Sequence, residues 1–147
     1  MHNKKFHIKL YKKALDKEDF SHLYNKIFFI TGATGFLGMW LLKTIDYLNK
    51  TLSLNMKVIV LLRNKKKKTS LLSFENTKIE YIHGKITNFS FKKKKIHHII
   101  HLAAETSEEK NKDHIEVMNT IINGTIRIIE YSKLVKATSI SYLSSGG

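Results

Sequence analysis

Five short apolar segments alternate with segments of helical periodicity along the chain of 147 residues. The apolar segments are residues 26–31, 57–62, 78–83, 96–102 and 139–143. Continuous apolar runs of this length are typical of strands that are buried on both faces of a parallel sheet. The alternation therefore predicts β-α-β units and an α/β fold with about five strands.

Two of the intervening segments repeat apolar residues every three or four positions. The first carries Leu37, Leu41, Ile45 and Leu48, with Trp40 and Thr44 on the same stripe. The second carries Ile115, Met118, Ile122, Ile126 and Ile129. This spacing predicts two amphipathic crossover helices, each with one apolar stripe.

The remaining segments have a weaker pattern. Residues 63–76 are polar and lysine-rich around one pair of leucines, and they allow either a short helix or a loop. The first 25 residues carry apolar side chains at a helical spacing, namely Phe6, Leu10, Tyr11 and Leu15. We therefore expect an N-terminal helical extension over residues 1–25, packed outside the sheet, and one domain over residues 26–147.

The composition is that of one soluble domain. The chain has 26 lysines and arginines against 12 acidic residues, a net charge of +14, and it has no cysteine or proline. Disulfides and thiolate metal sites are therefore excluded. The longest apolar runs, 27–30 and 58–62, are far shorter than the roughly 20 residues of a membrane span. Because the charged first residues also lack the apolar core of a secretory signal, we expect a cytoplasmic protein.

The positive charge raises the question of nucleic-acid binding, since basic surfaces attract polyanions without sequence contacts. Only Arg63 and Arg127 are arginines, however, and arginine is the usual residue for bidentate recognition of phosphates and bases. The lysine runs 65–68 and 92–95 fall between apolar segments, as solvated loops do. The sequence therefore argues against a nucleic-acid partner.

A glycine-rich segment lies where the first strand should end and the first helix should begin. Residues 31–38 read TGATGFLG and place glycines at 32, 35 and 38. Glycines between a buried strand and a helix leave room for a pyrophosphate to approach backbone amides. By position, Gly32 would permit the tight turn, Gly35 the approach of phosphates, and Gly38 the packing of helix against strand.

Together with VIVLLRN, IIHLAAE, NGT and YLSSGG further along the chain, this segment resembles the extended short-chain dehydrogenase/reductase superfamily. Within it, the sequence is similar to the nucleotide-sugar branch, the NAD-dependent epimerase/dehydratase family. The resemblance runs from about Lys26 to Gly147 and implies a Rossmann-type, doubly wound parallel sheet. It also implies an enzyme of nucleotide-sugar metabolism and polysaccharide biosynthesis, which oxidises a sugar hydroxyl by hydride transfer to NAD or NADP.

The resemblance also implies which residues bind the cofactor. They are Gly32, Thr34, Gly35, Phe36, Leu37 and Gly38 in the turn, Arg63 after the second strand, and Leu102, Ala103 and Ala104 after the fourth. NAD-preferring members usually carry an acid after the second strand, whereas Arg63 could meet a 2′-phosphate, which favours NADP over NAD. Two positions depart from the family pattern, because Lys85 replaces an aspartate and Ile121 replaces an asparagine.

Ser145 matches the catalytic serine or threonine of the family, which hydrogen-bonds the oxygen of the reacting hydroxyl. Its partners, a tyrosine followed four residues later by a lysine, are absent beyond it; Tyr81 and Lys85 have this spacing but fall in a strand. Family members are about twice as long and add a substrate domain. We therefore expect a fragment, truncated after about five strands and inactive alone, whose full-length form binds a nucleotide sugar and is compatible with a homodimer.

Two other functions remain open on the sequence. An acyl-thioester reductase of the same superfamily also combines TGATGFLG with a strand that ends in Leu-Arg, and a non-catalytic dinucleotide-binding module would need no tyrosine or lysine. His97, His98 and His101 raise the question of a metal site, but alternation along a strand sends neighbouring side chains to opposite faces. We expect no metal site there.

Overall fold

The computed structural model describes residue 15, residues 18–103 and residues 114–144 of the chain. Its five strands are β1 (Ile27–Thr31), β2 (Lys57–Leu62), β3 (Lys78–His83), β4 (His98–His101) and β5 (Ser139–Tyr142). They form one parallel sheet in the order β3-β2-β1-β4-β5. All five predicted strands and the Rossmann-type α/β fold are confirmed.

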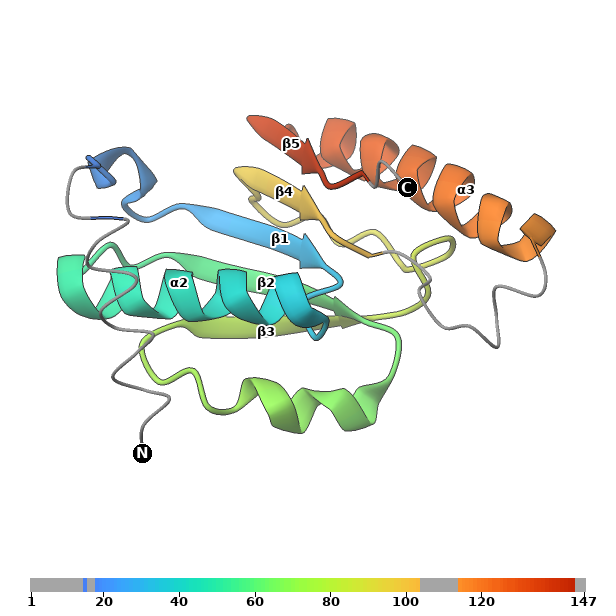
Figure 1. Cartoon of the computed structure of the whole chain (residues 1–147). Helices are drawn as coiled ribbons and strands as arrows, with labels where there is room; N and C mark the ends of the chain where they lie inside the picture. The colour runs from blue at the N-terminus through green and yellow to red at the C-terminus, as the bar shows by residue number, and fades with distance from the viewer. Residues whose placement is uncertain (1–14, 16–17, 104–113, 145–147) are drawn as a thin grey trace.

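Two long helices make crossovers between parallel strands. Helix α2 (Phe36–Leu52) connects β1 to β2, and helix α3 (His114–Val135) precedes β5. Two short 3₁₀ helices, η1 (Ser21–Leu23) and η2 (Lys65–Leu71), complete the described elements, so residues 63–76 do contain a short helix. Figure 1 shows α2 crossing one face of the sheet, while α3 runs beside β4 and β5.

Helix α2 covers the face of the sheet to which alternate residues of β1 and β2 point. Leu42, Ile45 and Leu48 are buried there against strand residues such as Ile30 and Val60. The predicted stripe is right for Ile45 and Leu48, but Leu37 is 51% exposed. Leu37 belongs to the first turn of α2, within the glycine-rich segment.

Helix α3 packs on the opposite face through a mixed apolar and aromatic cluster. Ile128 and Tyr131 are buried in this cluster with Phe29, Phe89 and three strand isoleucines among others. The ring of Tyr131 meets that of Phe29 edge-on at 5.1 Å, and its hydroxyl donates to the Lys92 carbonyl at 2.9 Å. The linker between β3 and β4 supplies Phe89, so side chains rather than a helix fill this part of the face.

The apolar stripe expected for this helix lies on its outer side. Ile115, Met118, Ile122, Ile126 and Ile129 are between 41% and 72% exposed, although an amphipathic helix normally buries such a stripe. The predicted helix is therefore confirmed, and its apolar stripe does not face the sheet. A second set of residues faces the sheet instead: Gly124, Ile128, Tyr131 and Ser132. A Cβ on Gly124 would lie 2.9 Å from the Ile86 side chain, so glycine permits the close approach of α3.

The N-terminal segment is described only in part. The predicted helix over the first 25 residues falls mostly on residues 1–14 and 16–17, which lie outside the described residues. Leu15, Phe20 and Leu23 pack against the α2 side of the core. The division into an extension and one domain stays a prediction. Among the described residues, no helix is long and apolar enough to cross a membrane.

Candidate functional site

The candidate site lies where the strand order reverses. Strand β1 pairs with β2 on one side and with β4 on the other, and the connections from β1 and β4 leave in opposite directions. In open parallel α/β sheets, ligands bind in the crevice at the carboxyl ends of the strands at such a point. The glycine-rich segment follows β1 directly, and residues 102–103 follow β4.

Two glycines hold this segment close to neighbouring backbone. Gly32 has a φ of +70°, and a Cβ there would lie 2.7 Å from the Leu102 carbonyl oxygen and the Ala103 nitrogen. A Cβ on Gly38 would lie 2.3 Å from the Gly32 carbonyl oxygen. Gly35 differs, because it is exposed, its backbone is extended, and a Cβ would meet only the Gly32 oxygen at 3.2 Å. The turn is therefore tight on its inner side and open at Gly35.

Helix α2 begins at this open side. Gly35 is its N-cap residue and has no side chain to accept a hydrogen bond, and the first turn of α2 contains no acidic residue. The amide of Met39 is bonded to the Gly35 carbonyl, so the three preceding amides lie before the first bond of the helix. A helix N-terminus of this kind favours an anion, because its amides and its dipole both present positive charge.

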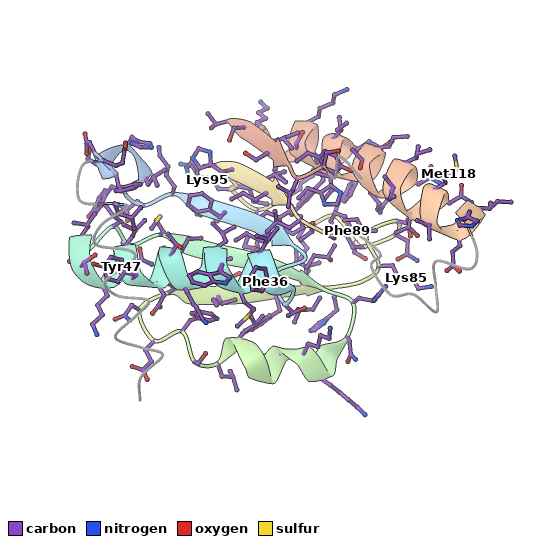
Figure 2. The ribbon with its side chains drawn as sticks, viewed as in Figure 1. Phe36, Tyr47, Lys85, Phe89, Lys95 and Met118 are labelled. Carbon is purple, nitrogen blue, oxygen red and sulfur yellow. The ribbon has the colours of Figure 1, made fainter. Side chains whose placement is uncertain are left out.

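Two apolar side chains stand beside this helix end. Phe36 is 79% exposed and Leu37 51% exposed, and the Phe36 ring meets Trp40 edge-on at 6.5 Å. Figure 2 shows Phe36 on the outer side of α2. The predicted aromatic and apolar pair is therefore at the surface next to the turn, where it is accessible to a ligand.

The carboxyl ends of β1 and β4 are joined by a buried polar contact that the sequence analysis did not foresee. Thr31 Oγ1 lies 2.6 Å from Nδ1 of His101 and accepts a hydrogen bond from the Ala103 amide at 3.2 Å. With that amide donating, the hydroxyl proton is left for Nδ1, which assigns the neutral Nε2–H tautomer to His101. Burial lowers the pKa of His101, in agreement with a neutral ring. The only signal in the sequence is a threonine that ends an apolar strand immediately before the glycine turn.

The remaining predicted residues divide between described and undescribed segments. Thr34 lies within the turn, and Arg63 is exposed directly after the last residue of β2. The Leu102 amide donates to the Thr31 carbonyl at 3.2 Å, which places Leu102 and Ala103 against the turn. Ala104 and Ser145 lie outside the described residues.

The pair with the spacing of a catalytic tyrosine and lysine is not arranged for catalysis. Tyr81 lies in the middle of β3, where burial raises its pKa, whereas a base needs a lowered pKa. The ammonium of Lys68 stands over its ring at 4.8 Å, and Lys85 follows Gly84 beyond the strand. Tyr81 is therefore a structural residue of the α2 side of the core.

The three histidines around β4 each have their own partner. His97 Nδ1 accepts from the Ile27 amide at 2.9 Å, and His98 Nδ1 lies 2.8 Å from the Ser139 hydroxyl. Burial lowers the pKa of both rings, as it does for His101. Over residues 18–103 and 114–144, no group of three potential metal ligands is found.

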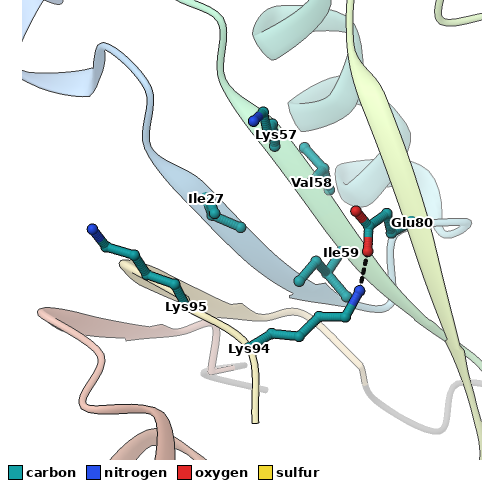
Figure 3. A pocket seen from close by; sticks show the side chains of 7 residues that line it. All are labelled: Ile27, Lys57, Val58, Ile59, Glu80, Lys94 and Lys95. Carbon is teal, nitrogen blue, oxygen red and sulfur yellow. Dashed lines mark hydrogen bonds and ion pairs between the residues drawn. The ribbon is translucent and has the colours of Figure 1, made fainter. Parts of the chain in front are cut away.

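A separate cavity of about 210 Å³ lies at the opposite, amino edge of the sheet (Figure 3). Lys94 forms an ion pair with Glu80 across it, and this hydrogen bond lowers the pKa of the Glu80 carboxyl. The lining residues are Ile27, Lys57, Val58, Ile59, Glu80, Lys94 and Lys95. None of them belongs to the predicted site.

The comparison that decides the family is with models of protein families. The model of the NAD-dependent epimerase/dehydratase family matches residues 28–147, a segment that includes the glycine turn, β1 from Phe28 onward and the other four strands. The chain belongs to this family. Its members are NAD(P)-dependent and generally enzymes. A search among curated protein sequences finds no significant match.

Solved structures with the same fold are distant in sequence. PbgP3 from Burkholderia pseudomallei aligns with a TM-score of 0.58 at 19% identity, over 80% of this chain and 38% of that chain. The dTDP-glucose 4,6-dehydratase DesIV from Streptomyces venezuelae, solved with NAD and TYD bound, gives 0.56 at 15% identity, over 78% and 38%. The reductase domain of the aureusimine biosynthetic cluster gives 0.55 at 21% identity, over 84% and 34%. The chain thus spans little more than a third of each of these structures.

Proposed function

We propose that this chain binds the pyrophosphate of NADP or NAD at the glycine turn and is the cofactor-binding part of a nucleotide-sugar epimerase or dehydratase. One observation carries the proposal. The open side of the turn at Gly35 faces an α2 N-terminus that has neither a side-chain cap nor an acidic residue in its first turn. Membership of an NAD(P)-dependent family supports the same assignment.

The residues present fit a dinucleotide. Side chains at Gly32 or Gly38 would clash with backbone, so the turn keeps its amides close to the surface, where a diphosphate can reach them. When bound, the nicotinamide supplies the hydride acceptor for oxidation of a sugar hydroxyl. Leu102 and Ala103, held against the turn through Thr31, would line the ribose side of the cofactor.

NADP is the preferred cofactor in this proposal. The end of β2 lies next to the end of β1, so its following residue is placed to meet the adenosine ribose. That residue is Arg63, and residues 57–73 contain no aspartate or glutamate that could accept a ribose 2′-hydroxyl. A guanidinium is suited to a 2′-phosphate, because it is positively charged and can donate two parallel hydrogen bonds to the phosphate oxygens.

The substrate class follows from the family and from the motif resemblance. The epimerase/dehydratase family model and the fold shared with a dTDP-glucose 4,6-dehydratase support a nucleotide sugar. In the whole enzyme, Ser145 would hydrogen-bond the hydroxyl that is oxidised. The 147-residue chain would bind the cofactor without turnover. Tyr81 and Lys85 are not arranged as a general base and the lysine that lowers its pKa.

An acyl-thioester reductase is the second candidate. The observation that favours it is the combination of the TGATGFLG turn with Leu62 at the end of β2 and Arg63 directly after it. The two candidates share the cofactor site and differ in the substrate that the complete enzyme would take.

Calorimetric titration of the chain with NADP⁺ and NAD⁺ tests the cofactor proposal. We expect tighter binding of NADP⁺, and Arg63→Ala should weaken NADP⁺ at least tenfold while NAD⁺ changes less than threefold. When nucleotide sugars are added, the absorbance of reduced nicotinamide should not increase, because the chain alone should not turn over substrate. The proposal would be refuted if the chain bound neither dinucleotide. It would also be refuted if dinucleotide binding were lost at moderate salt and DNA bound with the same affinity as the dinucleotides.

A further inference from the structure

The cavity at the amino edge of the sheet lies where no crossover helix covers the strands. Residues 84–97 connect the parallel strands β3 and β4, and the structure describes all of them without a helix. Such connections usually contain a helix that packs on the sheet. Here Phe89 and Ile96 of the linker are buried against the sheet instead. A space of about 210 Å³ is left beside the first residues of β1 and β2.

The floor of this cavity is apolar. Ile59 is buried in the α3 side of the core, and Ile27 packs against the same cluster. Lys94 crosses the cavity to its ion pair with Glu80, so the aliphatic part of its side chain adds apolar surface. An engineered apolar cavity of ~150 Å³ is large enough to hold benzene. The amino-edge cavity can therefore take one ring or an apolar group of similar size.

The charged groups around the cavity are predominantly positive. Three lysines and one glutamate line it, so three positive charges face one negative charge. Figure 3 shows the Lys94 ammonium directed at Glu80 and the Lys95 ammonium directed away from this pair. Among the described residues, neither Lys57 nor Lys95 takes part in an ion pair. Two ammonium groups of the lining are therefore left for an anion.

We propose that the amino-edge cavity binds a small organic anion with one ring-sized apolar group, of the class of aromatic carboxylates. The apolar group would lie against Ile27 and Ile59, and the carboxylate between the ammonium groups of Lys57 and Lys95. Ligand pockets typically combine an apolar lining with a few polar groups that fix orientation, as this cavity does. The proposal does not depend on dinucleotide binding, because the glycine turn lies at the opposite edge of the sheet.

Glu80 sets a limit on the charge of the ligand. The hydrogen bond from Lys94, followed by the charges of Lys94, Lys78 and Lys57, lowers the pKa of its carboxyl, so it is ionised at neutral pH. A carboxylate in the lining repels every negative charge that enters. A monoanion with an apolar group gains from the floor as well as from the lysines, whereas inorganic phosphate gains from charge alone. The lining therefore favours the organic monoanion.

Three small probes separate the contributions of ring and charge. Benzoate carries both, benzamide has the same shape without the charge, and acetate has the charge without the ring. In backbone amide NMR titrations of the chain, we expect benzoate to bind with a Kd of about 1 mM or tighter, a reasonable affinity for so small a ligand. Benzamide and acetate should each bind at least tenfold more weakly. The largest shifts should fall at Ile27, Lys57 and Ile59, and NADP⁺ should not displace benzoate.

Two lysines of the same linker provide matched variants. Lys95→Met and Lys93→Met each remove one exposed positive charge and keep an unbranched side chain, but only Lys95 lines the cavity. We expect Lys95→Met to weaken benzoate binding at least fivefold and Lys93→Met to weaken it less than twofold. Glu80→Gln should tighten benzoate binding at least twofold, because it removes a like charge and releases Lys94. The circular dichroism spectrum should be unchanged in all three variants.

Four results would overturn the proposal. Without saturable shifts at the amino edge, the cavity does not bind benzoate. Equal affinity for benzoate and benzamide would exclude a role of the lysines. Equal weakening by Lys93→Met and Lys95→Met would show that the overall positive charge attracts the anion, not the cavity. Displacement of benzoate by DNA, with a steep dependence on salt, would assign the same lysines to a polyanion.

Discussion

The hydroxyl of Thr31 lies 2.6 Å from Nδ1 of His101, in a buried contact that joins the carboxyl ends of β1 and β4. The same hydroxyl accepts a hydrogen bond from the Ala103 amide, so it also holds the segment after β4 against the glycine turn. These strands are the two between which the sheet order reverses. The contact therefore lies directly beside the glycine turn at which we place the cofactor.

Thr31→Val should lower the free energy of unfolding by about 1–3 kcal/mol. Valine keeps the shape of threonine, but it leaves the Ala103 amide and His101 Nδ1 without their hydrogen-bond partner in a buried place. Urea unfolding followed by circular dichroism measures the change. Ser141→Ala, at an exposed position of β5, is the control and should change stability by less than about 0.5 kcal/mol. Equal stability of Thr31→Val and the parent chain would remove the role given to this hydroxyl.

Stability should fall as the pH is lowered from about 7.5 to about 5.5, the range in which histidine titrates. Burial lowers the pKa of His97, His98 and His101, so the unfolded chain binds more protons than the folded chain in this range. Protonation therefore favours unfolding. The pKa of Glu80 is also lowered, but its contribution is lost only at more acidic pH, as the pH falls through its folded pKa.

His101→Asn tests which histidine matters most for this pH dependence. The asparagine Oδ1 can still accept from Thr31, and the side chain does not titrate. Because His101 is only 3% exposed, the variant should have a flatter dependence of the melting temperature on pH than the parent chain. A parallel curve for parent and variant would show that His97 and His98 carry the effect.

Substitutions at Gly35 and Gly32 should affect cofactor binding and stability to different extents. Gly35→Ala should cost at most about 1 kcal/mol, because its φ is ordinary and its Cβ has one close contact, yet it should weaken dinucleotide binding at least tenfold by filling the open side. Gly32→Ala combines a φ of +70° with backbone clashes and should cost more than about 2 kcal/mol. Unfolding curves and calorimetry measure the two effects. Unchanged binding in folded Gly35→Ala would place the phosphates elsewhere.

Much of the fold was predictable because its strands are marked by sequence features that act locally. The run at residues 57–62 is apolar throughout, as a strand covered on both faces must be, and β2 occupies those residues. The glycine turn was equally plain, because strand, glycines and helix follow one another within a dozen residues. The Thr31 to His101 contact joins residues 70 positions apart, and no local pattern indicates it.

Helix α3 shows what periodicity leaves undetermined. It has apolar residues on two sides, and the pattern alone does not say which side meets the sheet. Packing decides, because Gly124 lets the helix approach Ile86 and Tyr131 can donate to a linker carbonyl from within the aromatic cluster. The stripe that the periodicity marks is the one that the structure exposes, as Ile122 illustrates.

The most direct test of cofactor binding at the glycine turn is a backbone amide NMR titration of the chain with NADP⁺. We predict that the amides of Gly32, Gly35, Phe36 and Ala103 shift first and to the largest extent, with saturation at a single affinity. Shifts confined to the lysine-lined cavity at the amino edge, around Lys57 and Lys94, or no saturable shifts at all, would contradict the account.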